Sequence, residues 1–189
     1  AGRVEKNRVG GVIESKLHWT LTTRIVLWAS GILIVAGAIY IGLLEWNNPA
    51  TLGQFDVGAK ILNAFTSSVY PRTAGFNALD ISQLYPETWL GIDVLMFIGG
   101  GSAGTAGGIK VTTAAILIFI VLTEIRGDTA VNVGKRRLPR SIQRQALTIV
   151  LLSALAVASS VLVLSIITDF TTDQLLFEVI SAFATVGLT

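Results

Sequence analysis

The glycine-rich stretch GGGSAGTAGGIKV, Gly99 to Val111, has the residue types and spacing of a loop that binds phosphate. Gly99-x-Gly101-x-x-Gly104 matches the dinucleotide fingerprint, an apolar run precedes it, and Glu124 lies twenty residues after Gly104. In a nucleotide-binding domain this pattern holds a pyrophosphate between a strand and a helix. A dinucleotide-binding oxidoreductase module is therefore one hypothesis. A backbone break inside a different kind of element is the other.

The composition indicates a membrane protein. Only 14% of the 189 residues are charged and 52% are hydrophobic, with a mean hydropathy of +0.69, whereas soluble domains carry about 25% charged residues. Ile25–Leu44 and Ala146–Thr168 contain no charge, and each is long enough to cross a hydrocarbon core of about 30 Å. We therefore expect an all-α integral membrane protein in contact with membrane lipid. Its membrane-crossing helices are expected over 17–46 and 139–168.

The basic residues orient the chain in the cytoplasmic membrane. Residues 1–24 and 126–144 carry five and six of the 14 Lys and Arg residues, and such an excess marks the cytoplasmic side. The acidic stretches, around 45–57, 78–87 and 169–173, are then outside. This gives a cytoplasmic segment over 1–16 and a cytoplasmic loop over 127–138. A net charge of +2 gives no indication of a nucleic-acid partner.

The glycine-rich stretch lies within one crossing. Residues 88–126 must pass from outside to inside, and as one helix they would measure about 58 Å, more than a whole bilayer of about 40–45 Å. Six glycines between Gly99 and Gly108 make a continuous helix costly. We expect a broken membrane helix over 88–126, whose unwound loop is buried in protein or lines a water-filled cavity. A Walker loop is excluded because Val111, not Ser or Thr, follows Lys110.

Two short apolar runs are repeated along the chain. Ile61–Tyr70 and Gln174–Ala184 are too short to span a membrane and follow outside segments. They predict re-entrant pore helices, over 57–71 and 172–184. Each is followed by a Thr-x-Gly stretch, and an offset of 112 residues aligns the two copies. The aligned pairs are Phe65 with Phe177, Thr73 with Thr185, Gly75 with Gly187, Phe76 with Leu188, and Asn77 with Thr189.

A Thr-x-Gly strand after a half-helix suits a cation filter. Glycine allows a positive φ, so successive carbonyl oxygens can turn toward one axis and replace the water shell of a cation. The half-helix points its partially negative end at the same place. An ordinary turn explains either copy alone equally well, but two matching copies favour filters over 73–77 and 185–189. The candidate potassium ligands are Thr73, Ala74, Gly75, Phe76, Asn77, Thr185, Val186, Gly187 and Leu188.

Three stretches, SSVYPRTAGFNALD, MFIGGGSAGTAGGIKVTT and FEVISAFATVGLT, resemble the Trk/Ktr/HKT superfamily of potassium transporters, most closely its Ktr-type membrane subunit. The resemblance covers nearly the whole chain from about Leu17. It implies four repeats of crossing helix, re-entrant pore helix, filter strand and second crossing helix around a pseudo-fourfold pore. Residues 17–126 correspond to the third repeat and 139–189 to the start of the fourth. With two filter strands present, the chain is expected to be part of a longer protein.

The resemblance also implies an activity and partners. Potassium is the transported ion, sodium is a candidate coupling or activating ion, and the subunit forms a homodimer with a cytosolic nucleotide-binding regulatory ring. The glycine-rich loop corresponds to an intramembrane gate beneath the filter. No carboxylate pair or nucleophile–base arrangement suggests an enzyme, although the oxidoreductase module and a purely structural membrane subunit remain alternatives. The candidate gate residues are Gly99, Gly100, Gly101, Ser102, Gly104, Thr105, Gly107, Gly108 and Lys110.

Overall fold

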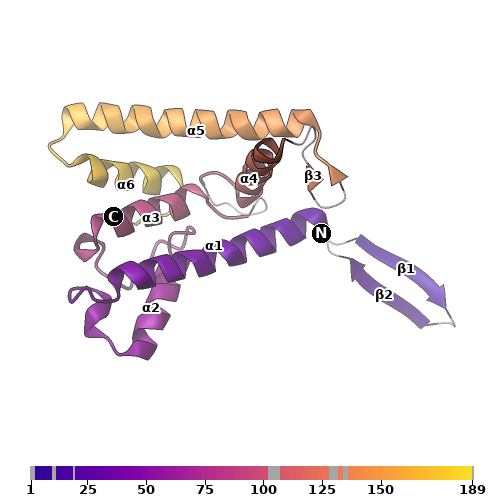
Figure 1. The fold of residues 1–189 in the computed structure, drawn as a ribbon, viewed down its shortest axis with the longest axis horizontal. Coiled ribbons are helices and arrows are strands. Elements are labelled where there is room, and N and C mark those ends of the chain that lie inside the picture. Colours follow the sequence, from indigo (N-terminus) through magenta and orange to yellow (C-terminus); the bar gives the residue numbers. More distant parts are fainter. Residues whose placement is uncertain are drawn as a thin grey trace.

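The computed structural model describes residues 3–9, 12–18, 20–101, 107–127, 132–133 and 136–188. Within these ranges, two long helices, α1 (Leu21–Glu45) and α5 (Arg140–Ile167), lie on either side of α3 (Pro86–Phe97), α4 (Val111–Arg126) and α6 (Thr172–Phe183) (Figure 1). Helix α1 packs against α3, α4 and α2 (Val57–Val69), while α6 lies between α3 and α5. The chain thereby builds two similar units, each made of a long helix, a short helix and an irregular strand.

Helix α1, Leu21–Glu45, is the first long helix. It begins later than the expected residue 17, because Leu17 and His18 belong to the preceding strand. Thr20 caps the helix: its backbone is extended and its hydroxyl accepts a hydrogen bond from the backbone N–H of Thr23 at 3.3 Å. An N-cap residue has non-helical backbone angles, so the helix cannot continue upstream of Thr20.

Helix α5, Arg140–Ile167, is the second long helix and follows Pro139. Thr22–Glu45 within α1 and the whole of α5 are long and apolar enough to cross a membrane, and each contains an 18-residue stretch of high mean hydropathy, 2.2 in α1 and 2.6 in α5. Their apolar side chains are largely exposed, as for Leu43 (76%) and Ile166 (84%). A helix in a soluble core would bury such side chains. The two helices therefore present a surface suited to lipid or to other membrane-embedded protein.

Two short helices are held by capping side chains at their starts. Helix α2 spans Val57–Val69, and the carboxylate of Asp56 accepts the backbone N–H of Gly58 at 3.2 Å. Helix α6 spans Thr172–Phe183 and begins with a reciprocal capping box between Thr171 and Gln174. Such caps satisfy first-turn N–H groups that have no partner inside the helix. Both helices lie inside the expected pore-helix ranges and are too short to span a bilayer.

Residues 88–126 do not form one continuous helix, as their glycines predict. Helix α3, Pro86–Phe97, and helix α4, Val111–Arg126, would measure only about 18 and 24 Å. Their facing ends are joined across the break: the backbone N–H of Ile109 donates to the carbonyl of Phe97 at 2.9 Å, and that of Val111 donates to Gly100 at 3.2 Å. The two ends of the glycine-rich loop are therefore hydrogen-bonded to each other between the two helices. We call this place the neck; it consists of Phe97, Gly100, Ile109 and Val111.

Two antiparallel hairpins add strands to the expected all-α fold. Strand β1, Arg3–Val9, pairs with β2, Val12–His18, and β3, Asn132–Val133, pairs with β4, Arg136–Arg137. They occupy the segments expected to be cytoplasmic. Charge counts predict where these segments lie along the chain but carry no information on their conformation. The chain also has two 3₁₀ turns, Leu52–Gln54 and Ile81–Gln83.

Close approach of α1 and α2 depends on one glycine and one serine. A Cβ at Gly37 would collide with the hydroxyl of Ser68. That hydroxyl is fully buried and donates to the carbonyl of Ile34 at 2.8 Å. The bond ties the C-terminal end of the short helix to the middle of the long one, and it does not involve the strand that follows α2.

The carboxylate of Glu45 fixes the outer end of α1. Its side chain is fully buried, and Oε2 accepts from Asn48 Nδ2 and Thr51 Oγ1, both at 2.6 Å. Oε1 accepts from the backbone N–H of Tyr85 at 2.9 Å and from Thr88 Oγ1 at 2.5 Å. Four donors converge on one carboxylate, and they join the end of α1 to the start of α3.

We expect Glu45→Gln to destabilise the protein by about 2–4 kcal/mol. The amide offers one acceptor oxygen in place of two and directs an NH₂ group at buried donors, and hydrogen bonds to charged groups are worth about 1.5–3 kcal/mol each. Thermal unfolding in detergent measures the change. Glu87→Gln, at an exposed position in the first turn of α3, is the control and should change the unfolding temperature little. Equal unfolding temperatures for the two variants would contradict this role of Glu45.

Candidate functional site

The two Thr-x-Gly strands share an uncommon backbone conformation. Thr73 and Gly75 have φ values of 63° and 68°, and Thr185 and Gly187 have 55° and 81°. Among the described residues, these two threonines are the non-glycine residues with positive φ. Positive φ is an outlier for a β-branched residue, and such strain is kept mainly at functional sites. The 112-residue repeat therefore extends from the residue types to the strained backbone angles.

The two strands lie against each other at their glycines. A Cβ added to Gly75 would be 3.0 Å from the carbonyl oxygen of Val186, and one added to Gly187 would be 4.0 Å from the Cα of Gly75. Thr185 and Gly187 are exposed, whereas Val186 and Leu188 are 3% and 6% exposed. The second strand thus anchors alternate side chains in the protein and leaves its other positions on an open side.

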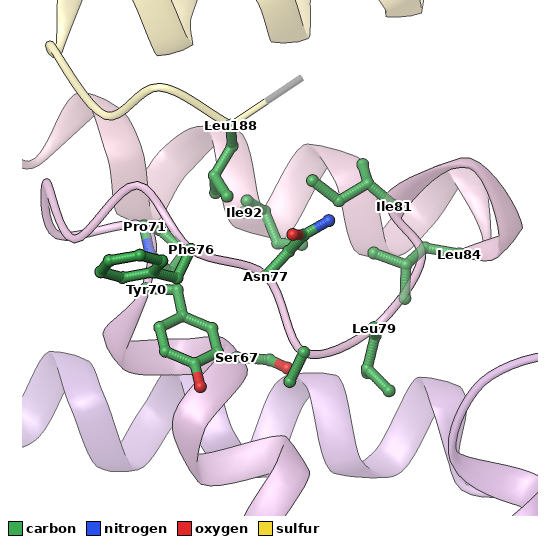
Figure 2. Close-up of a pocket in the computed structure, with 11 residues that line it drawn as sticks. Ser67, Tyr70, Pro71, Phe76, Asn77, Leu79, Ile81, Leu84, Ile92 and Leu188 are labelled. Atoms are coloured by element: carbon green, nitrogen blue, oxygen red, sulfur yellow. The ribbon is translucent and has the colours of Figure 1, made fainter.

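Figure 2 shows the side chains behind the first strand. Phe76 and Asn77 of the first strand and Leu188 of the second border one small pocket, together with Ile92 of α3 (Figure 2). The pocket has a volume of about 20 Å³, which is room for about one water molecule. The two Thr-x-Gly strands therefore contact the same, mostly apolar group of side chains. Phe76 itself is 70% exposed, unlike its counterpart Leu188.

Both short helices end at the strands. The backbone N–H of Ala74 donates to the carbonyl of Tyr70, the C-cap of α2, at 3.2 Å. In the second copy, the N–H of Val186 donates to the carbonyl of Ser181 at 2.9 Å. The C-terminal ends of α2 and α6, which carry partial negative charge, therefore lie directly before the strands. An ionised side chain is not needed for the site to attract a cation.

The far end of the glycine-rich loop lies against the second strand. The backbone N–H of Gly107 donates to the hydroxyl of Thr185 at 2.9 Å, and a Cβ at Gly107 would be 2.7–2.8 Å from backbone atoms of Ala184 and Phe183. Only a glycine fits this approach without displacing the end of α6. Loop and strand are thus in direct contact.

The other candidate gate residues differ in position. Gly99 lies against Gly107, so closely that a Cβ would collide with its carbonyl oxygen. Gly108 has a φ of 70° and Lys110 is the half-buried N-cap of α4. Gly100 and Gly101 are half-buried at the neck. Ser102, Gly104 and Thr105 lie outside the described residues, as does Thr189 in the second strand.

The dinucleotide hypothesis does not fit the local fold. Its fingerprint requires a strand immediately before the glycines, but the residues up to Phe97 belong to helix α3. Ile98 and Ile109 form only an isolated bridge. The glycines instead connect two helices, α3 and α4.

The sequence does not indicate three polar residues near the site whose side chains are buried wholly or in part. Ser181 on α6 is 2% exposed and donates to the carbonyl of Leu188 at 2.6 Å. Arg72 precedes the first strand, and its buried Nε and Nη2 have no hydrogen-bond partner among the described residues. Asp93 on α3 is 4% exposed, and its Oδ1 likewise has no partner in the described part of the chain. A single serine, arginine or aspartate has no spacing signal, although the 112-residue alignment could have drawn attention to Ser181.

The fold and site define a class: a helical membrane protein in which a unit of long helix, short helix and strained Thr-x-Gly strand is repeated. Comparison with known proteins agrees. Residues 14–189 match the family model TrkH, described as "Cation transport protein". The chain belongs to the TrkH family of cation transport proteins, which places it in the cell membrane.

Curated relatives align along most of the chain. It is 38% identical over 179 residues to "Ktr system potassium uptake protein B" of Vibrio alginolyticus, which covers 91% of this chain and 39% of that protein. It is 35% identical over 171 residues to the protein of the same name from Bacillus subtilis (90% and 38%). The identity to "Potassium/sodium uptake protein NtpJ" of Enterococcus hirae is 32% over 174 residues (90% and 38%). The chain thus spans about two fifths of the length of these relatives.

Proposed function

We propose that this chain supplies two of the filter strands and the gate of a potassium-uptake protein. The observation that carries the proposal is the pair of Thr-x-Gly strands with positive φ at both Thr and Gly, which meet at Gly75 and Gly187. Relatives named for potassium uptake support the choice of ion. A structural membrane subunit would have no use for two strained copies of one strand.

The mechanism follows from the backbone. Carbonyl oxygens of the strands replace the water around a potassium ion, and the C-terminal ends of α2 and α6 add a favourable field. Neither 73–77 nor 185–188 contains a charged side chain, so the ion is not bound too tightly to leave. Discrimination against sodium depends on how well the strained strands hold their carbonyls in position.

The glycine-rich loop acts as the gate in this proposal. Its end at Gly107 is hydrogen-bonded to Thr185 at the start of the second strand, so the loop lies next to the ion path. The neck formed by Phe97 and Ile109 holds the two ends of the loop together. Opening then requires rearrangement of the loop alone, with α3 and α4 staying in place.

Partners follow from the family. We propose a homodimer of the full-length subunit in membrane lipid, regulated by a cytosolic nucleotide-binding ring, because two relatives are named as components of a Ktr system. Sodium is proposed as a coupling or activating ion, since one relative is named for potassium and sodium uptake.

Potassium uptake by the full-length protein tests the function. Cells that lack their own potassium-uptake systems should grow at low potassium when they express it, and should take up rubidium as a potassium tracer. A dinucleotide-dependent enzyme would instead bind nicotinamide cofactor, and a structural subunit would do neither. Absence of uptake by correctly inserted protein, with and without its regulatory partner, would contradict the proposal.

Cysteine labelling tests the orientation. The chain contains no cysteine, so single cysteines can be placed at Asp80 and Asp169, which are exposed, and at Val133 and Ser141. We expect an impermeant maleimide to label the first two in intact cells and the last two only after permeabilisation. The reverse pattern would overturn the orientation derived from the basic residues.

A further inference from the structure

We propose that Ser181 is the positioning residue of the second filter strand. The proposal rests on the proposed filter function and identifies a residue that controls it without touching the ion. Ser181 lies in the last turn of α6 and is 2% exposed. No ion or water has direct access to its hydroxyl.

Ser181 holds the strand at two points. Its backbone carbonyl accepts the N–H of Val186 at 2.9 Å, and its hydroxyl donates to the carbonyl of Leu188 at 2.6 Å. The two bonds lie on either side of Gly187, whose φ is 81°. One residue therefore fixes the N–H of Val186 and the carbonyl of Leu188, and so limits how far the carbonyls of Val186 and Gly187, which lie between these two groups, can rotate.

The first strand has no equivalent of this hydroxyl. The 112-residue offset places Val69 at the position of Ser181, and a valine side chain cannot donate a hydrogen bond. Phe76, the counterpart of Leu188, is 70% exposed against 6% for Leu188. The backbone angles are repeated in the two strands, but the hydrogen bond from a buried hydroxyl and the buried side chain that hold the second strand are not. The second strand is accordingly the better-held of the two, and ion preference should depend on Ser181.

The test compares Ser181→Ala with a matched serine. Ser68 lies on the other short helix, is fully buried and donates to a backbone carbonyl at 2.8 Å, but its acceptor is Ile34 of α1. Ser68→Ala removes the same chemistry from the last turn of the first short helix, but the bond that is lost goes to α1 and not to a filter strand. Both variants are made in the full-length protein, and inhibition of rubidium uptake by potassium and by sodium is measured on correctly inserted protein.

We expect Ser181→Ala to lower the preference for potassium over sodium by roughly 2- to 10-fold, the range set by one ordinary hydrogen bond. Ser68→Ala should keep the wild-type preference. Ser181→Thr, which retains the hydroxyl, should restore it. If Ser181→Ala does not insert, Ser181→Cys replaces it, because the thiol has a similar shape and is a weak donor.

The outcomes separate this inference from the filter itself. A wild-type preference in Ser181→Ala, together with a changed preference in Gly187→Ser, would overturn the role of Ser181 and leave the filter in place. Equal losses in Ser181→Ala and Ser68→Ala would also overturn it, because the effect would then be general destabilisation. A wild-type preference in both Ser181→Ala and Gly187→Ser would contradict the proposed filter.

Discussion

Replacement of Gly75 by serine in the full-length transporter is expected to abolish most of its discrimination between potassium and sodium. Gly75 has a φ of 68°, and a Cβ would approach the carbonyl oxygen of Val186 to 3.0 Å. Strained backbone of this kind costs about 1–3 kcal/mol. Since 1.4 kcal/mol is a factor of ten in relative affinity, the preference should fall about 10- to 100-fold. Competition of potassium and sodium for rubidium uptake measures it.

The corresponding change at Gly187 is expected to have a smaller effect. Its φ of 81° is equally unfavourable for serine, but a Cβ would have 4.0 Å of space before the Cα of Gly75. The strain is present without the crowding. The contacts therefore predict a larger loss of ion preference in Gly75→Ser than in Gly187→Ser.

Gly127 provides the matched control for both. It has a φ of 71° at the end of α4, and its added Cβ would have no atom of the described residues within 4 Å. Gly127→Ser introduces comparable backbone strain far from the strands and should keep the wild-type ion preference. If Gly75→Ser and Gly187→Ser also keep it, the assignment of the Thr-x-Gly strands as a filter is wrong.

Shortening the glycine-rich loop should raise potassium flux. Deleting residues 102–104 removes part of the loop beyond the neck, while the bonds from Ile109 to Phe97 and from Val111 to Gly100 remain available to join α3 and α4. If the loop obstructs the ion path, each 1.4 kcal/mol removed from the barrier raises flux about tenfold while the gate is limiting. The ion preference should change little, because the strands are intact.

A deletion of equal length separates gating from a general effect of shortening. Removing residues 128–130, between α4 and α5, leaves the neck and both strands untouched and should leave the flux unchanged. Flux is compared per molecule of inserted, monodisperse protein. Equal or lower flux after the 102–104 deletion would show that the loop is a packing kink and not the gate.

Much of this fold is predictable from patterns that extend over many residues of the sequence. The two uncharged runs, the six glycines and the 112-residue repeat indicated α1, α5, the break between α3 and α4, and the places of the two short helices. Each depends on hydrophobicity or on the backbone preference of glycine, both of which are properties of the sequence alone. The strands β1 to β4 were missed because their segments were judged only by charge.

The details of the site depend on contacts between distant residues. The bond from Gly107 to Thr185 and the bracing of Leu188 by Ser181 join residues whose proximity no local pattern specifies. The same holds for the carboxylate of Glu45, which is a charge at a helix end in the sequence and a four-fold acceptor in the structure. Sequence identified the strands, but not the groups that hold them.

The position of a bound ion tests the central claim most directly. Anomalous diffraction from crystals of the full-length protein in rubidium, or in thallium(I) as a potassium substitute, locates the ion without any assay of transport. We predict anomalous density between the strands, beside the carbonyl oxygens of 73–75 and 185–187, and a loss of this density in Gly75→Ser crystals. Density found only away from both strands, for example beside the buried carboxylate of Asp93, would contradict the assignment of these strands as the ion-selective filter.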